Sequence, residues 1–66
     1  MRYEIRIAGA MLETTAREAF PELEPHILTT QTILCGPVTD EAHLYGLLLR
    51  FQELGLRVTE FRQLPE

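Results

Sequence analysis

Apolar and polar residues alternate at the start of the chain. In residues 2–8 the side chains of Tyr3, Ile5 and Ile7 alternate with charged or small ones, the period-two pattern of a strand with one face in water. Gly9 ends this predicted strand.

The segment 11–20 changes to helical spacing and predicts a short helix. Thr15, with Glu18 three residues later, fits a capping box, and Thr14 could equally cap the helix. Pro21 disfavours the helical conformation at the preceding residue and cannot continue the backbone hydrogen bonding, so we expect two or three turns. The apolar positions at this spacing are Leu12, Ala16, Ala19, Phe20 and Leu23.

Two β-rich runs surround residues 29–31, where the helical period fails and Thr and Ile favour strands. We predict a hairpin of residues 24–28 and 32–36. Its turn lacks the Gly or Asn that tight turns prefer, and the alternative is one continuous bent strand.

A second helix has both a start signal and a stop signal. Thr39 is the predicted N-cap, and Asp40 and Glu41 lie in the first turn, where the helix dipole favours anions. Gly55 is the expected left-handed stop, and Leu56 can fold back onto the last turn.

The last strand, residues 57–64, alternates imperfectly. Val58 and Phe61 would fall on opposite faces of a regular strand, which indicates a β-bulge near Thr59 or Glu60. The order strand, helix, strand, strand, helix, strand predicts an α+β, ferredoxin-like (split βαβ) fold. This is one antiparallel sheet with both helices on one face, formed by a single domain of residues 1–66.

The second helix is apolar on more than one side. The predicted core stripe contains Leu44, Leu47, Leu48, Phe51, Leu54 and Gly55, and the far side contains Ala42, Tyr45, Gly46 and Leu49. A glycine within a helix costs about 1 kcal/mol relative to alanine, and small residues one turn apart let another backbone approach closely. The far side is therefore a predicted interface. Alternatively, Tyr45 and Leu49 only wrap the helix edge, and Gly46 is merely tolerated.

The sheet face without helices is a second predicted apolar surface. Strand periodicity sends neighbouring residues to opposite faces, so some apolar residues must point away from the helices. The expected residues are Leu28, Leu34 or Ile33, and either Val58 or Phe61.

The small size of the chain changes how its stability is explained. A chain of 66 residues buries only about 60% of its unfolded surface, so small domains often rely on disulfides, metals or self-association. Cys35 is the only cysteine, which excludes a disulfide within the chain and fits a reducing cytosol. No leader or membrane-spanning run is apparent. We expect a complete, soluble, cytoplasmic protein that forms a homo-oligomer.

Charge and composition exclude several functions. The net charge is −4, from ten acidic residues against six arginines, which disfavours a nucleic-acid partner. The chain has no serine and no lysine, so a serine nucleophile, a Schiff-base lysine and a P-loop lysine are all excluded.

Soft metal ligands and a Cys-His pair are the remaining candidate chemistry. In the predicted hairpin His26 lies opposite Leu34 and Cys35 points to the other face, while His43 lies on the second helix. No short metal spacing exists, and nothing local orients a base toward the thiol. We therefore expect an inert cysteine, no metal, no cofactor and no catalytic residue.

The segment GPVTDEAHLYGLLLRFQELGLRVTEFRQL resembles the C-terminal half of a family of short uncharacterised bacterial proteins, with the pattern G-x-x-x-D-Q-A-x-L-H-G-L-L followed by L-G-L and a final strand. RYEIRIAG and AFPEL resemble its N-terminal half. Glu41 stands where the family tends to have Gln, and Tyr45 where it tends to have His. The resemblance implies a fold but no activity. The matching residues are Gly36, Asp40, Ala42, Leu44, Gly46, Leu47, Leu48, Leu54, Gly55 and Leu56.

Together these patterns predict a small non-enzymatic module that self-associates and also binds a further protein. A ligand-sensing regulatory domain, ACT-like by analogy of fold, is the alternative, and a Cys-dependent enzyme is a third hypothesis.

Overall fold

The computed structural model describes residues 1–65. It contains β1 (Arg2–Ala8), α1 (Glu13–Ala19), β2 (Glu24–Ile27), β3 (Gln31–Pro37), α2 (Glu41–Glu53) and β4 (Val58–Leu64). The predicted element order is confirmed, and the fold is α+β with two helices and one four-stranded antiparallel sheet. The helices of the described residues are too short or too polar to cross a membrane.

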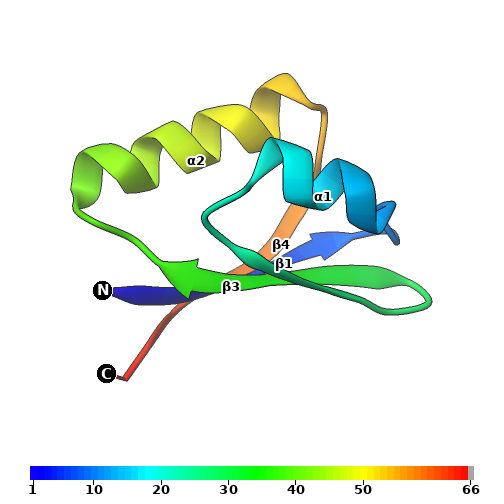
Figure 1. The fold of residues 1–66 in the computed structure, drawn as a ribbon, viewed down its shortest axis with the longest axis horizontal. Helices are drawn as coiled ribbons and strands as arrows, with labels where there is room; N and C mark the ends of the chain where they lie inside the picture. Colours follow the sequence, from blue (N-terminus) through cyan, green and yellow to red (C-terminus); the bar gives the residue numbers. More distant parts are fainter. Residues whose placement is uncertain (66) are drawn as a thin grey trace.

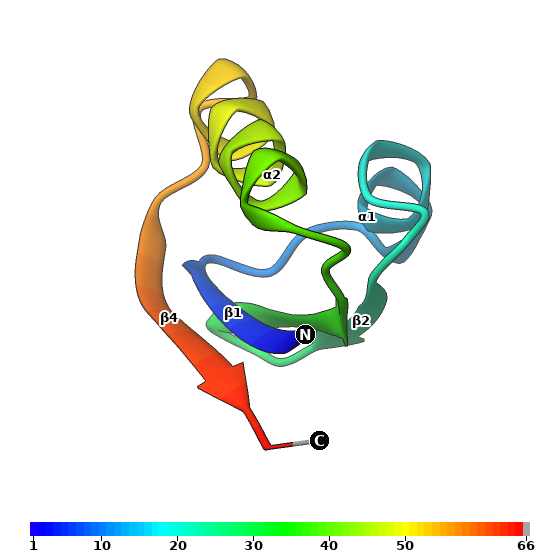
Figure 2. The same cartoon turned by 90° about the vertical axis from the view of Figure 1, so that its left-hand side faces the viewer.

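The strands lie in the order β2-β3-β1-β4, so β1 and β3 are central and β2 and β4 form the edges. Both helices cover the same face of the sheet, and the opposite face carries no helix (Figures 1 and 2). The core lies between these two layers. Its buried apolar residues are Ile5, Ile7, Ala16, Phe20, Leu23, Leu34, Val38, Leu47 and Phe51.

Two aromatic pairs join parts of the chain that are distant in sequence. The stacked rings of Phe20 and Phe51, with centroids 4.6 Å apart, connect the end of α1 to α2. The tilted rings of Tyr3 and Phe61, 5.0 Å apart, join β1 to β4. Aromatic pairs at these separations add stabilisation beyond the apolar area that they bury.

The start of α1 differs from the predicted capping box. The helix begins at Glu13 after Leu12, whose side chain cannot cap it, so neither Thr14 nor Thr15 is the N-cap. The segment is tethered instead by buried Thr32 of β3. Its hydroxyl donates to the Gly9 carbonyl and accepts from the Met11 N–H, each at 2.9 Å. The predicted short length is correct, since α1 has only seven residues.

Gly36 permits a close approach between β3 and the turn after α1. A Cβ at this position would lie 2.8 Å from the Glu22 carbonyl oxygen and 2.9 Å from a methyl carbon of Leu23. No side chain fits there, so the glycine allows Leu23 to close one end of the core.

The cap of α2 lies one residue later than predicted. Asp40 is the N-cap, and its carboxylate accepts a hydrogen bond from the His43 backbone N–H at 2.9 Å. The predicted stop is confirmed. Gly55 has φ +70°, and the Leu56 N–H returns to the Phe51 carbonyl at 2.9 Å.

The β2–β3 hairpin is confirmed, but its predicted register is wrong by one residue. Leu28 pairs with Gln31, and only Thr29 and Thr30 lie between them. His26 therefore lies opposite Ile33, and not Leu34. A shift of one residue sends every side chain of a strand to the other face relative to its partner.

The bulge in β4 is confirmed at Thr59. Arg6 pairs with Glu60 and Ile7 with Val58, so Thr59 is the extra residue. It brings Val58 and Phe61 to the same, helix-covered face, opposite Ile7 and Ile5. The prediction that one of these two residues faces away from the helices is therefore wrong.

Candidate interaction surface

The outer face of α2, formed by Ala42, Tyr45, Gly46 and Leu49, is exposed. The side chains of Tyr45 and Leu49 are 64% and 55% accessible, high values for residues of their size. Three residues of the predicted core stripe are also exposed, namely Leu48, Leu54 and Gly55, whereas Leu47 and Phe51 are buried completely. Leu48 is 38% exposed and Leu54 is 51% exposed. The core-facing stripe is thus narrower than predicted, and the exposed apolar surface of α2 is larger.

Within residues 1–65, nothing requires a glycine at position 46. A Cβ built there meets no atom within 4 Å beyond the nearby backbone of its own helix, and the positive φ angles of the described residues belong to Gly9 and Gly55. Gly46 therefore lowers helix stability without an internal packing or backbone reason. It contrasts with Gly36, whose environment excludes any side chain.

A polar cluster joins α2 to the turn after α1. Arg50 donates to both carboxylate oxygens of Glu22, at 2.9 and 3.0 Å, and to the Ala19 carbonyl at 3.1 Å. Its guanidinium also lies 5.8 Å from the centre of the Phe20 ring. This bidentate geometry defines the orientation of α2 and leaves Tyr45 and Leu49 pointing outward.

His43 completes the cluster through both ring nitrogens. Nδ1 accepts the Thr39 backbone N–H at 3.0 Å, so it carries no proton in this arrangement. Nε2 lies 3.0 Å from Glu22 and is the nitrogen that donates. His43 therefore links the α2 cap to the Glu22–Arg50 pair.

The cluster strongly stabilises the charged form of Glu22. The hydrogen bonds from Arg50 are the main cause that lowers the pKa of this carboxyl to about 2, helped by the bond from His43. Partial burial acts in the opposite direction and is the weaker effect.

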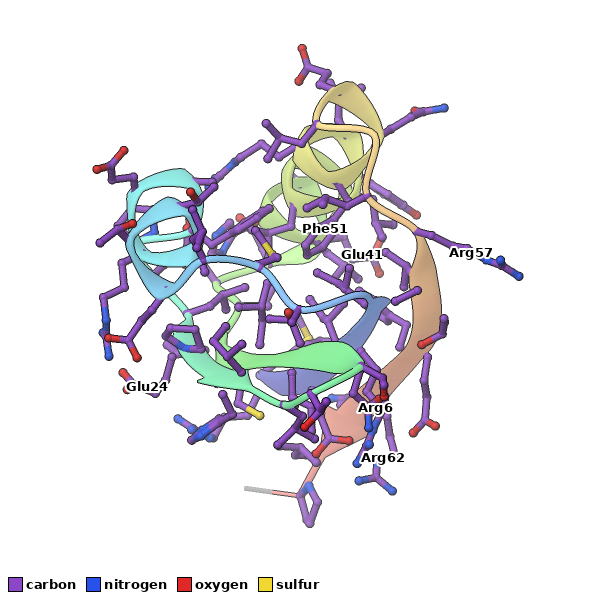
Figure 3. All side chains as sticks on the ribbon, turned by 90° about the vertical axis from the view of Figure 1, so that its right-hand side faces the viewer. Arg6, Glu24, Glu41, Phe51, Arg57 and Arg62 are labelled. Atoms are coloured by element: carbon purple, nitrogen blue, oxygen red, sulfur yellow. The ribbon has the colours of Figure 1, made fainter. Side chains whose placement is uncertain are left out.

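The helix-free face of the sheet is more polar than predicted. Glu4 accepts from Arg6 at 3.2 Å and from Arg62 at 3.0 Å, so charged side chains cover the β1–β4 half (Figure 3). Leu34 is buried in the core, and of the expected apolar residues Ile33 takes the outward position. Of the residues predicted to point to this face, Ile33 does so, whereas Val58 and Phe61 pack against the core, and the face is therefore less apolar than predicted.

The register brings Cys35 and His26 to this same face, although the predicted register separated them. Cys35 lies opposite Glu24, and His26 lies two residues along the strand from Glu24. Burial, followed by the charge of Glu4, raises the pKa of the Cys35 thiol. This favours the thiol over the thiolate, which is the nucleophile and the metal ligand. Residues 1–65 contain no pocket and no group of three or more His, Cys, Asp or Glu side chains arranged to hold a metal ion.

Comparison with known proteins gives one match. The model of a family described as "Domain of unknown function (DUF8691)" matches residues 2–62. The chain belongs to this family. Neither the curated proteins nor the solved structures contained a match. Membership of the family adds no activity to the surfaces described above.

The exposed helix face was predictable from sequence, and the polar cluster was not. The four far-side residues were identified from the 3.6-residue period of α2 alone. Glu22, His43 and Arg50 gave no such signal, because 28 residues separate Glu22 from Arg50 along the chain. A weak indication was the Pro-bounded turn at Glu22, which places a carboxylate at the end of a short helix.

Proposed function

We propose that this chain is a small non-enzymatic module that self-associates through the outer face of α2. The contact residues are Ala42, Tyr45, Gly46 and Leu49, and the partner is a second copy of the chain. The observation that carries the proposal is the open space beside Gly46. A helix-destabilising glycine with no role inside its own chain is explained if another backbone packs against it.

Two exposed apolar side chains frame this position. Tyr45 and Leu49 lie one helical turn apart, so together with Ala42 and Gly46 they form a shallow surface with small residues beside large ones. An interface between two copies related by a two-fold axis uses the same patch twice, which suits one helix face packed against itself. The non-enzymatic part of the proposal is supported by the raised pKa of the Cys35 thiol, which disfavours its use as a nucleophile.

The fold and the cellular setting belong to the same proposal. The strand order β2-β3-β1-β4, with both helices on one face, supports a ferredoxin-like fold. The single free cysteine supports a cytoplasmic location. A further protein partner would use α2 surface that the second copy leaves exposed.

Molar mass in solution tests the proposal. Size-exclusion chromatography with light scattering over a dilution series should give a mass above that of one chain at high concentration. Gly46→Leu should shift the mass toward one chain, because the larger side chain separates the two helices. Far-ultraviolet circular dichroism should be unchanged, since a side chain at this position meets open space within the chain.

A matched control is Thr14→Leu, which adds an exposed leucine to α1 away from the proposed interface. It should assemble as the parent does. The helix-face proposal is wrong if Gly46→Leu also assembles like the parent.

A further inference from the structure

The two edges of the sheet differ in how well they are protected from pairing with another strand. Edge strand β2 has only four residues and includes Pro25, whereas edge strand β4 has seven residues and no proline. The Leu28 N–H donates to the Gln31 carbonyl in β3, so the backbone groups of every second residue of β2 point toward β3. The backbone nitrogen of Pro25 therefore points out of the sheet edge. A proline at this position removes an outward N–H, a common way to block edge pairing. Edge strand β4 lacks that protection.

Hydrogen bonds at the ends of β1 show which residues of β4 are left unpaired. The Ala8 N–H donates to Arg57 and the Arg6 carbonyl accepts from the Thr59 hydroxyl, so even-numbered residues of β1 face β4. The backbone groups of the odd-numbered residues point toward β3 instead, since the Met1 carbonyl and the Gly9 N–H bond to residues next to that strand. The β4 residues opposite the even positions therefore use their backbone groups within the chain. They are Glu60, Arg62 and Leu64.

The backbone groups of Phe61 and Gln63 consequently point out of the free edge, because the two sides of a strand alternate. We propose that this edge pairs antiparallel with the β4 edge of a second copy, about a two-fold axis that passes beside Phe61. In this arrangement the two Phe61 residues exchange both backbone hydrogen bonds. Each Gln63 lies opposite Thr59 of the other copy, and the two sheets become one continuous sheet.

The side chains of β4 select this register. When Phe61 lies opposite its copy, Glu60 lies opposite Arg62 of the second chain, and Arg62 lies opposite Glu60. Both side chains are on the helix-free face and about half exposed, at 49% for Glu60 and 56% for Arg62. An axis at Glu60 or Arg62 would instead place like charges opposite each other, which is unfavourable. The strand is therefore complementary in charge to itself in a register that its free backbone groups allow.

The bulge residue Thr59 lies at the end of the proposed pairing, opposite Gln63 of the second copy, and the central residues Glu60, Phe61 and Arg62 are outside the bulge. The register with β1 is regular from Glu60 to Leu64. Both the edge and the outer face of α2 can be used at once, because they are different surfaces of the chain. Two isologous contacts of this kind form either a closed assembly or a chain of subunits.

Amide exchange followed by NMR tests the edge directly. In a dilute sample the outward N–H groups of Phe61 and Gln63 should exchange quickly, while those of Glu60 and Arg62 stay protected by β1. In a concentrated sample Phe61 and Gln63 should become protected too, by about tenfold or more. Rapid exchange of both amides in a concentrated sample that light scattering shows to be associated would overturn the proposal, and so would a monomer at that concentration.

Charge reversal gives a second test with an internal control. Glu60→Arg and Arg62→Glu each place like charges opposite each other in the homodimer, so each variant alone should associate more weakly than the parent. An equimolar mixture should regain association, because the two variant strands complement each other. Circular dichroism checks that each variant folds, since Arg62 also bonds Glu4 within the chain. A mixture that associates no better than the separate variants contradicts the proposed register.

Gln63→Pro separates this inference from the helix-face proposal. The outward N–H of Gln63 is not used inside the chain, so its loss should leave the fold intact. It should weaken edge pairing by about tenfold or more. If Gly46→Leu abolishes association and Gln63→Pro leaves it unchanged, the edge inference is wrong and the helix proposal stands. The reverse pattern supports the edge and contradicts the helix face.

Discussion

Glu22 and Arg50 form a bidentate ion pair, with Nη1–Oε1 and Nη2–Oε2 distances of 2.9 and 3.0 Å, across 28 residues of chain. The pair joins the turn after α1 to the last turn of α2. The same guanidinium also bonds the Ala19 carbonyl, so Arg50 joins the two helices beside the stacked rings of Phe20 and Phe51. The orientation of the proposed α2 interface depends on this contact.

The pair predicts a loss of stability in acid. The folded pKa of Glu22, about 2, lies below its ordinary value of 4.5. The Glu22 carboxylate therefore makes its full contribution to the free energy of unfolding above about pH 4.5, and this contribution is lost as the pH falls toward 2. Because water screens this partly exposed pair, we expect a loss of about 1–2 kcal/mol of unfolding free energy. Urea denaturation between pH 6 and pH 2.5 measures it.

Arginine variants give the control for this measurement. Arg50→Met keeps an apolar stem but removes the bidentate contact, so the acid-induced loss should become smaller and stability at pH 6 should fall. Arg57→Met removes a side chain that points away from the molecule (Figure 3). It should reproduce the parent curve. An unchanged acid-induced loss in Arg50→Met would show that another group causes it.

The two glycines Gly36 and Gly46 predict opposite effects of the same substitution. Gly36→Ala forces a Cβ against the Glu22 carbonyl, a backbone atom that cannot move without shifting the turn, and should cost about 1–3 kcal/mol. Gly46→Ala meets open space and should stabilise the dilute protein by about 0.5–1 kcal/mol through helix propensity. Thermal melts at low protein concentration give both values. Equal effects would contradict the described packing of β3 against the turn.

Alanine substitutions at two neighbouring residues test the cap of α2. Asp40→Ala removes the side-chain acceptor for the His43 N–H and should cost about 1 kcal/mol of unfolding free energy. Thr39→Ala should have little effect, because Thr39 contributes its backbone N–H to the His43 ring. Urea denaturation at pH 7 measures both. If Thr39→Ala lost more unfolding free energy than Asp40→Ala, Thr39 would be the N-cap, as predicted from the sequence.

Local signals were sufficient where neighbouring residues decide the outcome. The alternation of β1, the stop at Gly55 and the bulge at Thr59 each depend on a few adjacent residues, and each was predicted correctly. Element order and fold class followed from these signals. The exposure of Tyr45 and Leu49 followed from the helical period alone.

The predictions failed for features that depend on contacts between residues distant in the chain. The first helix begins before its apparent cap because Thr32, in another strand, holds the preceding residues. The hairpin register depends on which side chains β3 must bury, and the observed one-residue shift places Cys35 on the same face as His26. Neither effect leaves a trace in the local sequence, because both depend on packing between elements.

The elements, their order and the exposed face of α2 can be predicted from the chain alone, since hydrophobic periodicity and glycine stop signals act within one or two turns. The pairing of Glu22 with Arg50, the outward position of the Phe61 and Gln63 backbone groups, and the polar character of the helix-free face follow from tertiary packing. These depend on strand register and helix position. Register is set by how all the elements share one small core, which no single segment of the chain specifies.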